Sequence, residues 1–391
     1  MLSFVAKSSA ARAARMATSI LFFCAGFCFA SWASRIPQVQ VKLGLNEAAL
    51  GGVLLALPVG LIVGLPVSGF LVAKYGSRKI AIAAVLLYAA TLPLLGLTVS
   101  LWQLVALLFL FGFGGNLLNI SMNTQGAGVE YLYHRSIMAS FHGVWSLAGF
   151  TGAATGTLMV RYVIPPFLHF CIIAGIIYLL VWGAYKFLLE KDIHAGGEAP
   201  VFAKPDSYLL KLGLIAFCCM VCEGTMYDWS GVYFAKEVKA PPALVTSGFV
   251  AFMTTMAGGR FIGDRLSTKL GKKNMIGMSG ILIASGLMLS VIFPYIITAT
   301  AGFLLTGMGV SSVVPLVYGA AARSGKVASG VALAAVSTVG YLGFLFGPPV
   351  IGFIAQALNL RWSFALIAML GFCTTLLAGY VGGEDKKDRK V

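Results

Sequence analysis

The sequence predicts an all-α membrane protein with twelve transmembrane helices in two pseudo-symmetric six-helix bundles. Three observations predict this fold class. Only 10% of the 391 residues are charged and 59% are hydrophobic, with a mean hydropathy of +0.91, which is not typical of a water-soluble chain of this length. Apolar runs long enough to cross a bilayer recur along the chain. The second half also repeats features of the first at a fixed offset.

The apolar runs give the expected helices. A bilayer core about 30 Å thick needs roughly 20 apolar residues for each helical crossing. Twelve runs approach or exceed this length, at 16–34, 48–73, 79–99, 101–124, 136–160, 165–187, 208–234, 243–265, 274–295, 296–321, 328–357 and 361–382. The first run follows an Arg- and Ser-rich start that imitates a transit or secretory peptide. We expect it to be an uncleaved first helix.

The basic residues predict the orientation. Loops on one side carry Lys7, Arg12, Arg15, Lys74, Arg78, Lys79, Lys186, Lys191, Lys204, Lys211, Lys269, Lys272, Lys273 and the tail "EDKKDRKV", whereas the other side has Arg35, Lys42, Arg161, Lys236, Lys239 and Arg361. The richer side is expected to be cytoplasmic, with both termini inside.

The composition also excludes several classes of function. The formal net charge is +15, but the bases lie at the ends of apolar runs, so no nucleic-acid partner is expected. The seven cysteines lie mostly within apolar runs and indicate neither disulfides nor a metal site. The Gly-rich stretches lack the context of a phosphate-binding loop, and no long soluble segment could house an ATPase. We expect no cofactor and no enzymatic activity.

A duplication organises the chain. "GLPVSGFLVAKYGSRK" from Gly64 matches "GRFIGDRLSTKLGKKN" from Gly259, and the same offset of 195 residues pairs Gly112 with Gly307 and Gly114 with Gly309. The longest polar connection lies between the two copies. The predicted domains are an N-terminal bundle at 1–187, a cytoplasmic linker at 188–207 and a C-terminal bundle at 208–391. Two parallel repeats of six helices are a transporter arrangement.

Several of these motifs resemble one family. "GFLVAKYGSRK" resembles the signature loop of the major facilitator superfamily. "NISMNTQGAGVEYLYHRSIMASFHGVWSLAGFTGA", "EGTMYDWSGVYF", "GRFIGDRL" and "GPPVIGF" resemble its fucose-permease-like branch, in particular bacterial inner-membrane proteins of the YbjJ and MosC type. The resemblance covers nearly the whole chain and implies the fold of that superfamily in a bacterial inner membrane. It also implies an acid in the signature loop, where this chain has Ala73, and an acid linked to proton coupling on the fourth helix, where this chain has Asn119.

Two acids stand out in the run 208–234. A charged side chain at mid-membrane costs about 2.5 to 3.5 kcal/mol on insertion scales. Counted from Lys211, Glu223 lies roughly 18 Å and Asp228 roughly 25 Å along a helix, about 140° apart around it. We expect Glu223 to be the proton-coupling residue, or else a hydrogen-bonded structural acid. Tyr227 shares its face. Asp228 is either a rim residue or a substrate contact.

Other polar side chains predict a substrate site. Asn116, Asn119 and Asn123 form one stripe that should face the bundle interior, where they either bind a polar solute or bond neighbouring helices. We expect substrate binding for Asn116 and Asn119, and a structural role for Asn123. The remaining candidate substrate residues are His142, Trp145, Ser337 and Tyr341, although a buried structural His and backbone-bonded hydroxyls remain alternatives. Trp32 is expected in the interfacial aromatic belt.

A set of charged residues predicts a cytoplasmic gate. Arg260 and Asp264 have the spacing of a local ion pair, and we group them with Lys74, Arg78, Glu130 and Arg135. These residues are expected to lie away from the substrate site.

The predicted function is secondary active transport of a small polar organic solute, sugar- or cyclitol-like, by alternating access coupled to protons. The expected partners are this solute, protons and membrane lipid, and the expected state is a monomer. The alternatives are proton-driven efflux of a metabolite or drug, and a membrane sensor or scaffold that does not transport.

Overall fold

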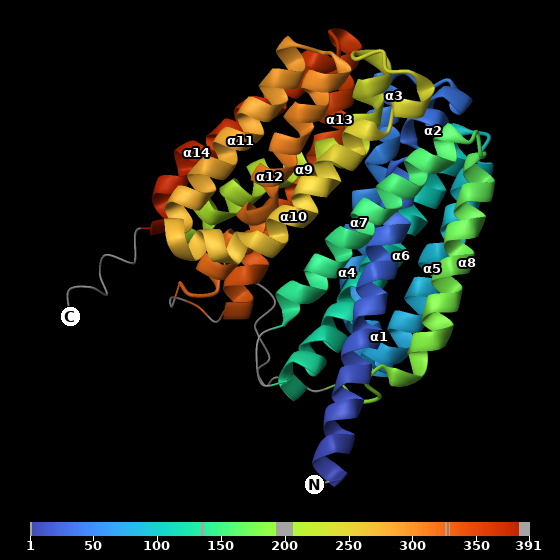
Figure 1. Ribbon diagram of the computed structural model, residues 1–391, viewed down its shortest axis with the longest axis vertical. Coiled ribbons are helices and arrows are strands. Elements are labelled where there is room, and N and C mark those ends of the chain that lie inside the picture. Colours follow the sequence, from blue (N-terminus) through green and yellow to red (C-terminus); the bar gives the residue numbers. More distant parts are fainter. Residues whose placement is uncertain (1, 134–136, 193–205, 325–326, 328, 383–391) are drawn as a thin grey trace. The chain divides into compact units, whose positions relative to one another are not determined.

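The computed structural model describes residues 2–133, 137–192, 206–324, 327 and 329–382, without the side chains of residues 2–9, 264 and 329–330 (Figure 1). The α-helices are α1 (Leu2–Ala33), α2 (Ile36–Leu43), α3 (Glu47–Leu54), α4 (Ala56–Tyr75), α5 (Ser77–Leu97), α6 (Leu101–Tyr133), α7 (Met138–Arg161), α8 (Pro166–Ala184), α9 (Ser207–Lys236), α10 (Ser247–Leu270), α11 (Lys272–Ile292), α12 (Ile296–Ala321), α13 (Ser329–Ala357) and α14 (Leu360–Leu377). Three short 3-10 helices are η1 (Tyr185–Phe187), η2 (Pro242–Leu244) and η3 (Ala378–Gly382).

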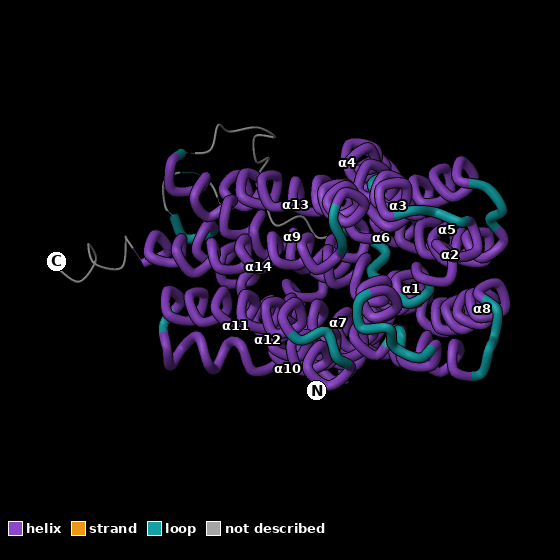
Figure 2. The backbone as a smooth tube through the Cα atoms, turned by 90° about the horizontal axis from the view of Figure 1, so that it is seen from above, coloured by secondary structure: helices purple, strands orange, loops and turns teal. Residues whose placement is uncertain are grey.

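Every predicted apolar run coincides with a long helix, and no strand occurs among the described residues (Figure 2). Ten of these helical segments are long and apolar enough to cross a membrane. The other two, α7 and α10, have 24 residues each. They fall outside that set because α7 is rich in Gly, Ala, Ser and Thr, and because α10 ends in a charged stretch. The run 48–73 is divided between α3 and α4 at Leu55.

The chain forms two compact units. Unit 1 comprises Met1–Gly44 and Val53–Gly196, and unit 2 comprises Leu45–Gly52 and Gly197–Val391. The sequence analysis assigned residues 45–52 to the N-terminal bundle at 1–187, whereas in the structure they belong to unit 2. They cluster with unit 2 because Gly51 packs against the backbone of Gly352 and because Glu47 forms an ion pair with Lys236. Of the predicted linker 188–207, residues 193–205 lie outside the described residues.

The two units use the same backbone geometry at equivalent positions. α4 ends at Gly76 with φ 84° and ψ 148°, and α10 ends at Gly271 with φ 78° and ψ 151°. Positive φ of this kind is available to glycine at little cost. These two glycines lie 195 residues apart, which is the offset of the sequence repeat.

The packing of helix pairs repeats as well. At Gly112 in α6 the backbone lies so close to the Leu57 carbonyl of α4 that a Cβ atom would collide with it. At Gly307 in α12 the same is true of the Phe252 carbonyl of α10. Both members of each pair are offset by 195 residues. Small residues allow such close approach of membrane helices, so the repeated glycines fix the equivalent helix pairs in both units.

Polar side chains of unit 1 hold residues 188–192, which follow α8 and η1, against the bundle. Gln125 of α6 donates from Nε2 to the Leu189 carbonyl at 3.0 Å and accepts the Leu189 N–H at 2.8 Å. Asp192 accepts the backbone N–H of Ser77 at the start of α5 at 2.8 Å. Residues 188–192 are therefore anchored to the bundle, although the sequence predicts that they belong to the linker.

The opposite end of unit 1 contains a buried cation. Arg35, between α1 and α2, is 0% exposed. Its Nε donates to Nδ1 of His169 at 3.0 Å, its Nη2 donates to the Ile164 carbonyl at 3.0 Å, and its Nη1 bonds Gln38. Burial lowers the pKa of Arg35 to about 10, so the guanidinium stays charged at neutral pH. These neutral acceptors tie the end of α1 to α8.

We expect Gly307→Ala to destabilise the protein, because the new methyl group would meet backbone atoms that cannot move independently of the helix. Overpacking of this kind costs about 1–3 kcal/mol. Thermal unfolding of the purified protein in detergent, followed by far-UV circular dichroism, measures the effect. Gly175→Ala in α8 is the control, since no atom lies within 4 Å of its Cβ position. Equal losses in the two variants would contradict the packing argument.

Candidate functional site

The candidate site is a charged cluster in unit 2. Glu223 lies in the middle of α9, and its side chain is 8% exposed. The hydroxyl of Tyr227, one turn further along, donates to Glu223 Oε1 at 2.6 Å. Arg260 of α10 places Nη2 3.4 Å from the same oxygen. Two helices thus bring an acid, a base and a phenol together, and one of them, α9, is long and apolar enough to cross a membrane.

Aromatic packing holds the phenol in place. The ring of Tyr227 makes edge contacts with Phe249 and Phe252 of α10, with ring centroids 6.3 and 5.8 Å apart. Its hydroxyl also lies 3.5 Å from Met256 Sδ. Because these rings fix the direction of the O–H bond, Tyr227 keeps the carboxylate of Glu223 in one orientation.

Glu223 makes two contacts of different length. An N–H···O bond is usually 2.7–3.2 Å long, so the 3.4 Å approach of Arg260 to Glu223 is a long contact. The Tyr227 bond, at 2.6 Å, is the shorter of the two. The carboxylate is therefore held more closely by Tyr227 than by Arg260.

The duplication supplies an internal comparison. At the repeat offset, the positions of Glu223, Tyr227 and Arg260 correspond to Cys28, Trp32 and Leu65 in unit 1. The helix packing there is equivalent: Gly26 of α1 lies against Ala148 of α7, as Val221 of α9 lies against Gly343 of α13. The same architecture thus forms without charge at these positions, and the charged cluster is not a requirement of the fold.

In unit 1 the predicted asparagines make helix contacts. Asn116 is 6% exposed, and its Oδ1 accepts from Ser68 of α4 at 2.7 Å. This contact supports the structural alternative for Asn116. Asn123 donates to the Asn119 carbonyl at 2.8 Å within α6, and both side chains are half-buried.

His142 and Trp145 of α7 lie beside α1. His142 is exposed and its ring packs edge-on against Phe22 with centroids 5.3 Å apart. The indole of Trp145 is stacked on Phe29 at 6.4 Å. The sequence prediction for Trp32 is wrong: this residue is 1% exposed and is buried in the protein, so it is not part of an interfacial belt.

The other predicted residues of unit 2 do not join the charged cluster by hydrogen bonds between described atoms. Asp228 is half-buried and lies about 140° around α9 from Glu223. Ser337 donates to the Ala334 carbonyl of its own helix at 3.2 Å. Tyr341 is 42% exposed, and its ring lies 6.3 Å from that of Phe344.

The predicted gate residues separate into different contacts. Lys74 lies over the rings of Phe70 and Tyr75. Arg78 forms an ion pair with Glu190 at 2.8 Å. Glu130 accepts the backbone N–H groups of Ile137 and Met138, at 2.7 and 2.8 Å, where α7 begins. Arg135 and the side chain of Asp264 lie outside the described residues.

Sequence analysis did not predict the contact between Arg260 and Glu223. The spacing to Asp264 suggested the gate, and this prediction stays untested because the side chain of Asp264 lies outside the described residues. A signal was present, since Arg260 occupies a position where the other repeat has Leu65.

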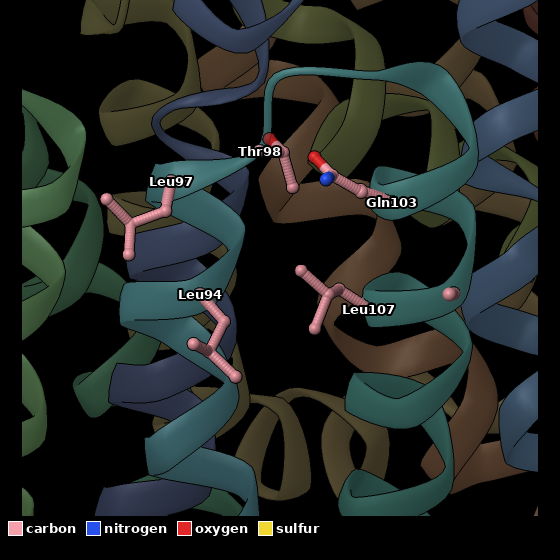
Figure 3. Close-up of a pocket in the computed structure, with 6 residues that line it drawn as sticks. Leu94, Leu97, Thr98, Gln103 and Leu107 are labelled. Carbon is pink, nitrogen blue, oxygen red and sulfur yellow. The ribbon is translucent and has the colours of Figure 1, made fainter.

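Two surface grooves lie elsewhere, and neither is lined by the charged cluster. One lies between α5 and α6 and has a volume of about 370 Å³; Figure 3 shows Leu94, Leu97 and Leu107 along it and Thr98 and Gln103 at one end. The other has a volume of about 390 Å³ and lies beside α11. No group of metal-ligating side chains occurs in the described part of the chain.

Known proteins match this chain along most of its length. The family model of the Major Facilitator Superfamily matches residues 18–327 and 214–391 of this chain. An uncharacterized MFS-type transporter of Yersinia pestis is 31% identical over 358 residues, which are 91% of this chain and 92% of that protein. The membrane protein MosC of Rhizobium meliloti is 30% identical over 362 residues, 91% of this chain and 87% of that one.

Solved structures share the fold. The nucleoside transporter NupG has a TM-score of 0.73 at 12% identity and covers 94% of this chain and 99% of its own. The E. coli fucose:proton symporter FucP has a TM-score of 0.62 at 15% identity, with 94% and 98% covered. The predicted all-α membrane fold in two six-helix bundles is confirmed by these likenesses.

The ion pair can be tested by a double-mutant cycle. Glu223→Gln and Arg260→Gln each leave one charge without its partner, whereas the double variant removes both charges. We expect the double variant to be more stable than the sum of the single losses predicts, with a coupling of about 0.5–3 kcal/mol. Thermal unfolding measures the cycle. Glu190→Gln, at a side chain that is 82% exposed, should change stability little. Additive losses would contradict a direct interaction.

Proposed function

Because the chain belongs to the major facilitator superfamily of membrane transporters, we propose that it is a secondary active transporter that works by alternating access. Its cargo is a small polar organic solute, sugar- or cyclitol-like, and its driving force is a proton gradient. It lies in the bacterial inner membrane as a monomer with both termini in the cytoplasm.

The charged cluster of unit 2 is the observation that carries the proposal. Charged side chains within membrane segments are expensive and usually functional. Glu223 lies in α9, which is long and apolar enough to cross a membrane, and its partner Arg260 lies in α10. The equivalent positions of unit 1, Cys28 and Leu65, are uncharged. The repeated scaffold therefore does not include this pair, which supports a role for it in function.

The proposed mechanism couples the proton to the solute through Arg260. While Glu223 is ionised, it holds the guanidinium at 3.4 Å. A proton on Glu223 weakens that attraction, and the N–H groups of Arg260 can then donate to hydroxyl oxygens of a solute. Loss of the proton reverses the exchange. Proton binding and solute binding therefore support each other, as co-transport requires.

The solute class follows from neutral hydrogen-bonding and aromatic groups. Asn119, His142, Trp145 and Tyr341 supply amide, imidazole, indole and phenol groups. Such side chains suit a compound with several hydroxyl groups and an apolar ring face. We retain Asn116, Tyr227, Asp228 and Ser337 as weaker contacts, because Asn116, Tyr227 and Ser337 already bond within the protein.

A membrane sensor that does not transport is the second candidate. The residues that favour it are Ala73 and Asn119, which stand where the resemblance to the superfamily implies acids. A sensor would bind the solute without moving it. Flux through reconstituted protein distinguishes the two candidates.

The transport experiment uses purified protein in liposomes. A thermal-shift screen of sugars and cyclitols first identifies a ligand, and uptake of that ligand is then followed with and without an imposed pH gradient. We expect accumulation only with the gradient, inward or outward according to its direction. Binding with no flux in either direction would contradict transport and favour the sensor.

Glu223→Gln tests the coupling residue. We expect this variant to lose gradient-driven accumulation and to keep solute exchange between loaded and external pools, because exchange needs no net proton movement. Glu190→Gln is the matched control, since it removes the same charge from an exposed side chain. Undiminished gradient-driven accumulation by Glu223→Gln would exclude Glu223 from the mechanism.

A further inference from the structure

Three phenols of unit 2 lie near the carboxylate of Glu223. Tyr227 donates to it at 2.6 Å within α9. The negative charge of Glu223 also acts on the hydroxyl groups of Tyr318 in α12 and Tyr341 in α13, and these two hydroxyl groups interact with each other. Tyr318 was not predicted as a site residue from the sequence.

Packing against α9 places Tyr341 beside the carboxylate. Gly224, the neighbour of Glu223, lies so close to α13 that a Cβ atom on it would be 2.8 Å from Phe344 Cδ1. Tyr341 lies one turn before Phe344, and the centroids of the two rings are 6.3 Å apart. The contact between Gly224 and Phe344 therefore fixes the position of Tyr341 relative to Glu223.

Packing against α10 places Tyr318. Gly259 directly precedes Arg260, and a Cβ atom on this glycine would collide with the side chain of Ser311 in α12. Ser311 thus faces α10 next to the ion pair. Tyr318 follows Ser311 by about two helical turns and so lies on the same face. Long side chains of a helix point toward its N-terminus, so the phenol extends from Tyr318 back toward Ser311 and the charged cluster.

The two additional phenols are more accessible than the acid. Glu223 and Tyr227 are only 6% and 5% exposed. Tyr318 is half-buried, and Tyr341 is 42% exposed. A solute that approaches this cluster therefore meets Tyr341 and Tyr318 before it meets the carboxylate.

The repeat shows that both phenols are particular to unit 2. Tyr318 and Tyr341 correspond to Asn123 and Ser146 of unit 1. These two shorter side chains donate to backbone carbonyls of their own helices, at 2.8 and 3.1 Å. Short polar side chains commonly bond to their own backbone in this way, whereas a tyrosine hydroxyl lies too far from its backbone to do so. Unit 2 thus carries at these positions hydroxyl groups that extend away from their helices.

We infer that Tyr318 and Tyr341 bind the solute directly, and that each phenol bonds one hydroxyl group of the same polyol molecule. A phenol can both donate and accept a hydrogen bond, so the pair suits hydroxyl groups. The bond between Tyr227 and Glu223 stays in place, so the solute and the proton use neighbouring groups. This inference rests on the proposed function, to which it adds Tyr318 and a solute with at least two hydroxyl groups.

Equilibrium binding to the full chain in detergent tests the inference without measuring flux. The probes are D-galactose, L-fucose and myo-inositol, and the tightest binder is then compared with its monodeoxy analogues. We expect Tyr318→Phe to weaken binding of that polyol about two- to tenfold, which is the effect of one lost neutral hydrogen bond. The melting temperature should stay unchanged, because the ring remains.

The monodeoxy analogues identify the hydroxyl group that each phenol bonds. The effect of Tyr318→Phe should vanish for one analogue, because that analogue lacks the partner hydroxyl group, and should persist for the others. Tyr341→Phe should give the same pattern with a different analogue. Tyr162→Phe in unit 1, at a residue that is 70% exposed, is the control and should change neither affinity nor stability.

Four results would overturn the inference. They are wild-type affinity in both Tyr318→Phe and Tyr341→Phe, the same loss of affinity for every analogue, a fall in melting temperature that accompanies the loss, and no binding of any of the three probes by the wild-type protein. Wild-type affinity in both variants with intact gradient-driven uptake would leave transport standing. The expected binding pattern without flux would instead support the inference and contradict transport.

Discussion

The structure depends on the absence of hydrogen-bonding solvent in hydrocarbon. Backbone groups must be satisfied inside helices, and without water to drive apolar surfaces together the helices associate through close packing. Gly112 against Leu57 and Gly307 against Phe252 show how this is achieved, because backbone meets backbone at these points in both units. The same constraint makes buried charges informative, because placing a charged side chain in hydrocarbon costs free energy.

Duplication allows structure and function to be separated. Features present in both units, such as the positive-φ glycines Gly76 and Gly271, belong to the scaffold. Features present in one unit are not part of that shared scaffold. By this criterion Glu223 with Arg260 is particular to unit 2, whereas the glycine contacts of α6 and α12 are shared. The proposed proton chemistry therefore lies in one half of the chain.

The sequence was sufficient for the fold but not for the contacts between helices. Hydropathy and helix length located every long helix, because lipid imposes both directly. They did not locate the break at Leu55, although Pro58 lacks the N–H that would bond the carbonyl of Leu54, where α3 ends. Spacing along one helix identified Glu223 with Tyr227, but it could not identify the contact of Arg260 with Glu223, because a partner on another helix has no fixed spacing. The prediction that Trp32 lies in an interfacial belt was wrong for a related reason. Hydropathy does not distinguish a lipid-facing side chain from one covered by protein.

The hydrogen bonds at both ends of the connection between the units limit where the chain can be altered. Gln125 and Asp192 hold residues 188–192 against unit 1, and the Asp206 side chain caps α9 by accepting the Leu209 N–H. A reporter or affinity sequence inserted at 188–192 would disturb unit 1, and one inserted at 206–209 would remove the cap of α9.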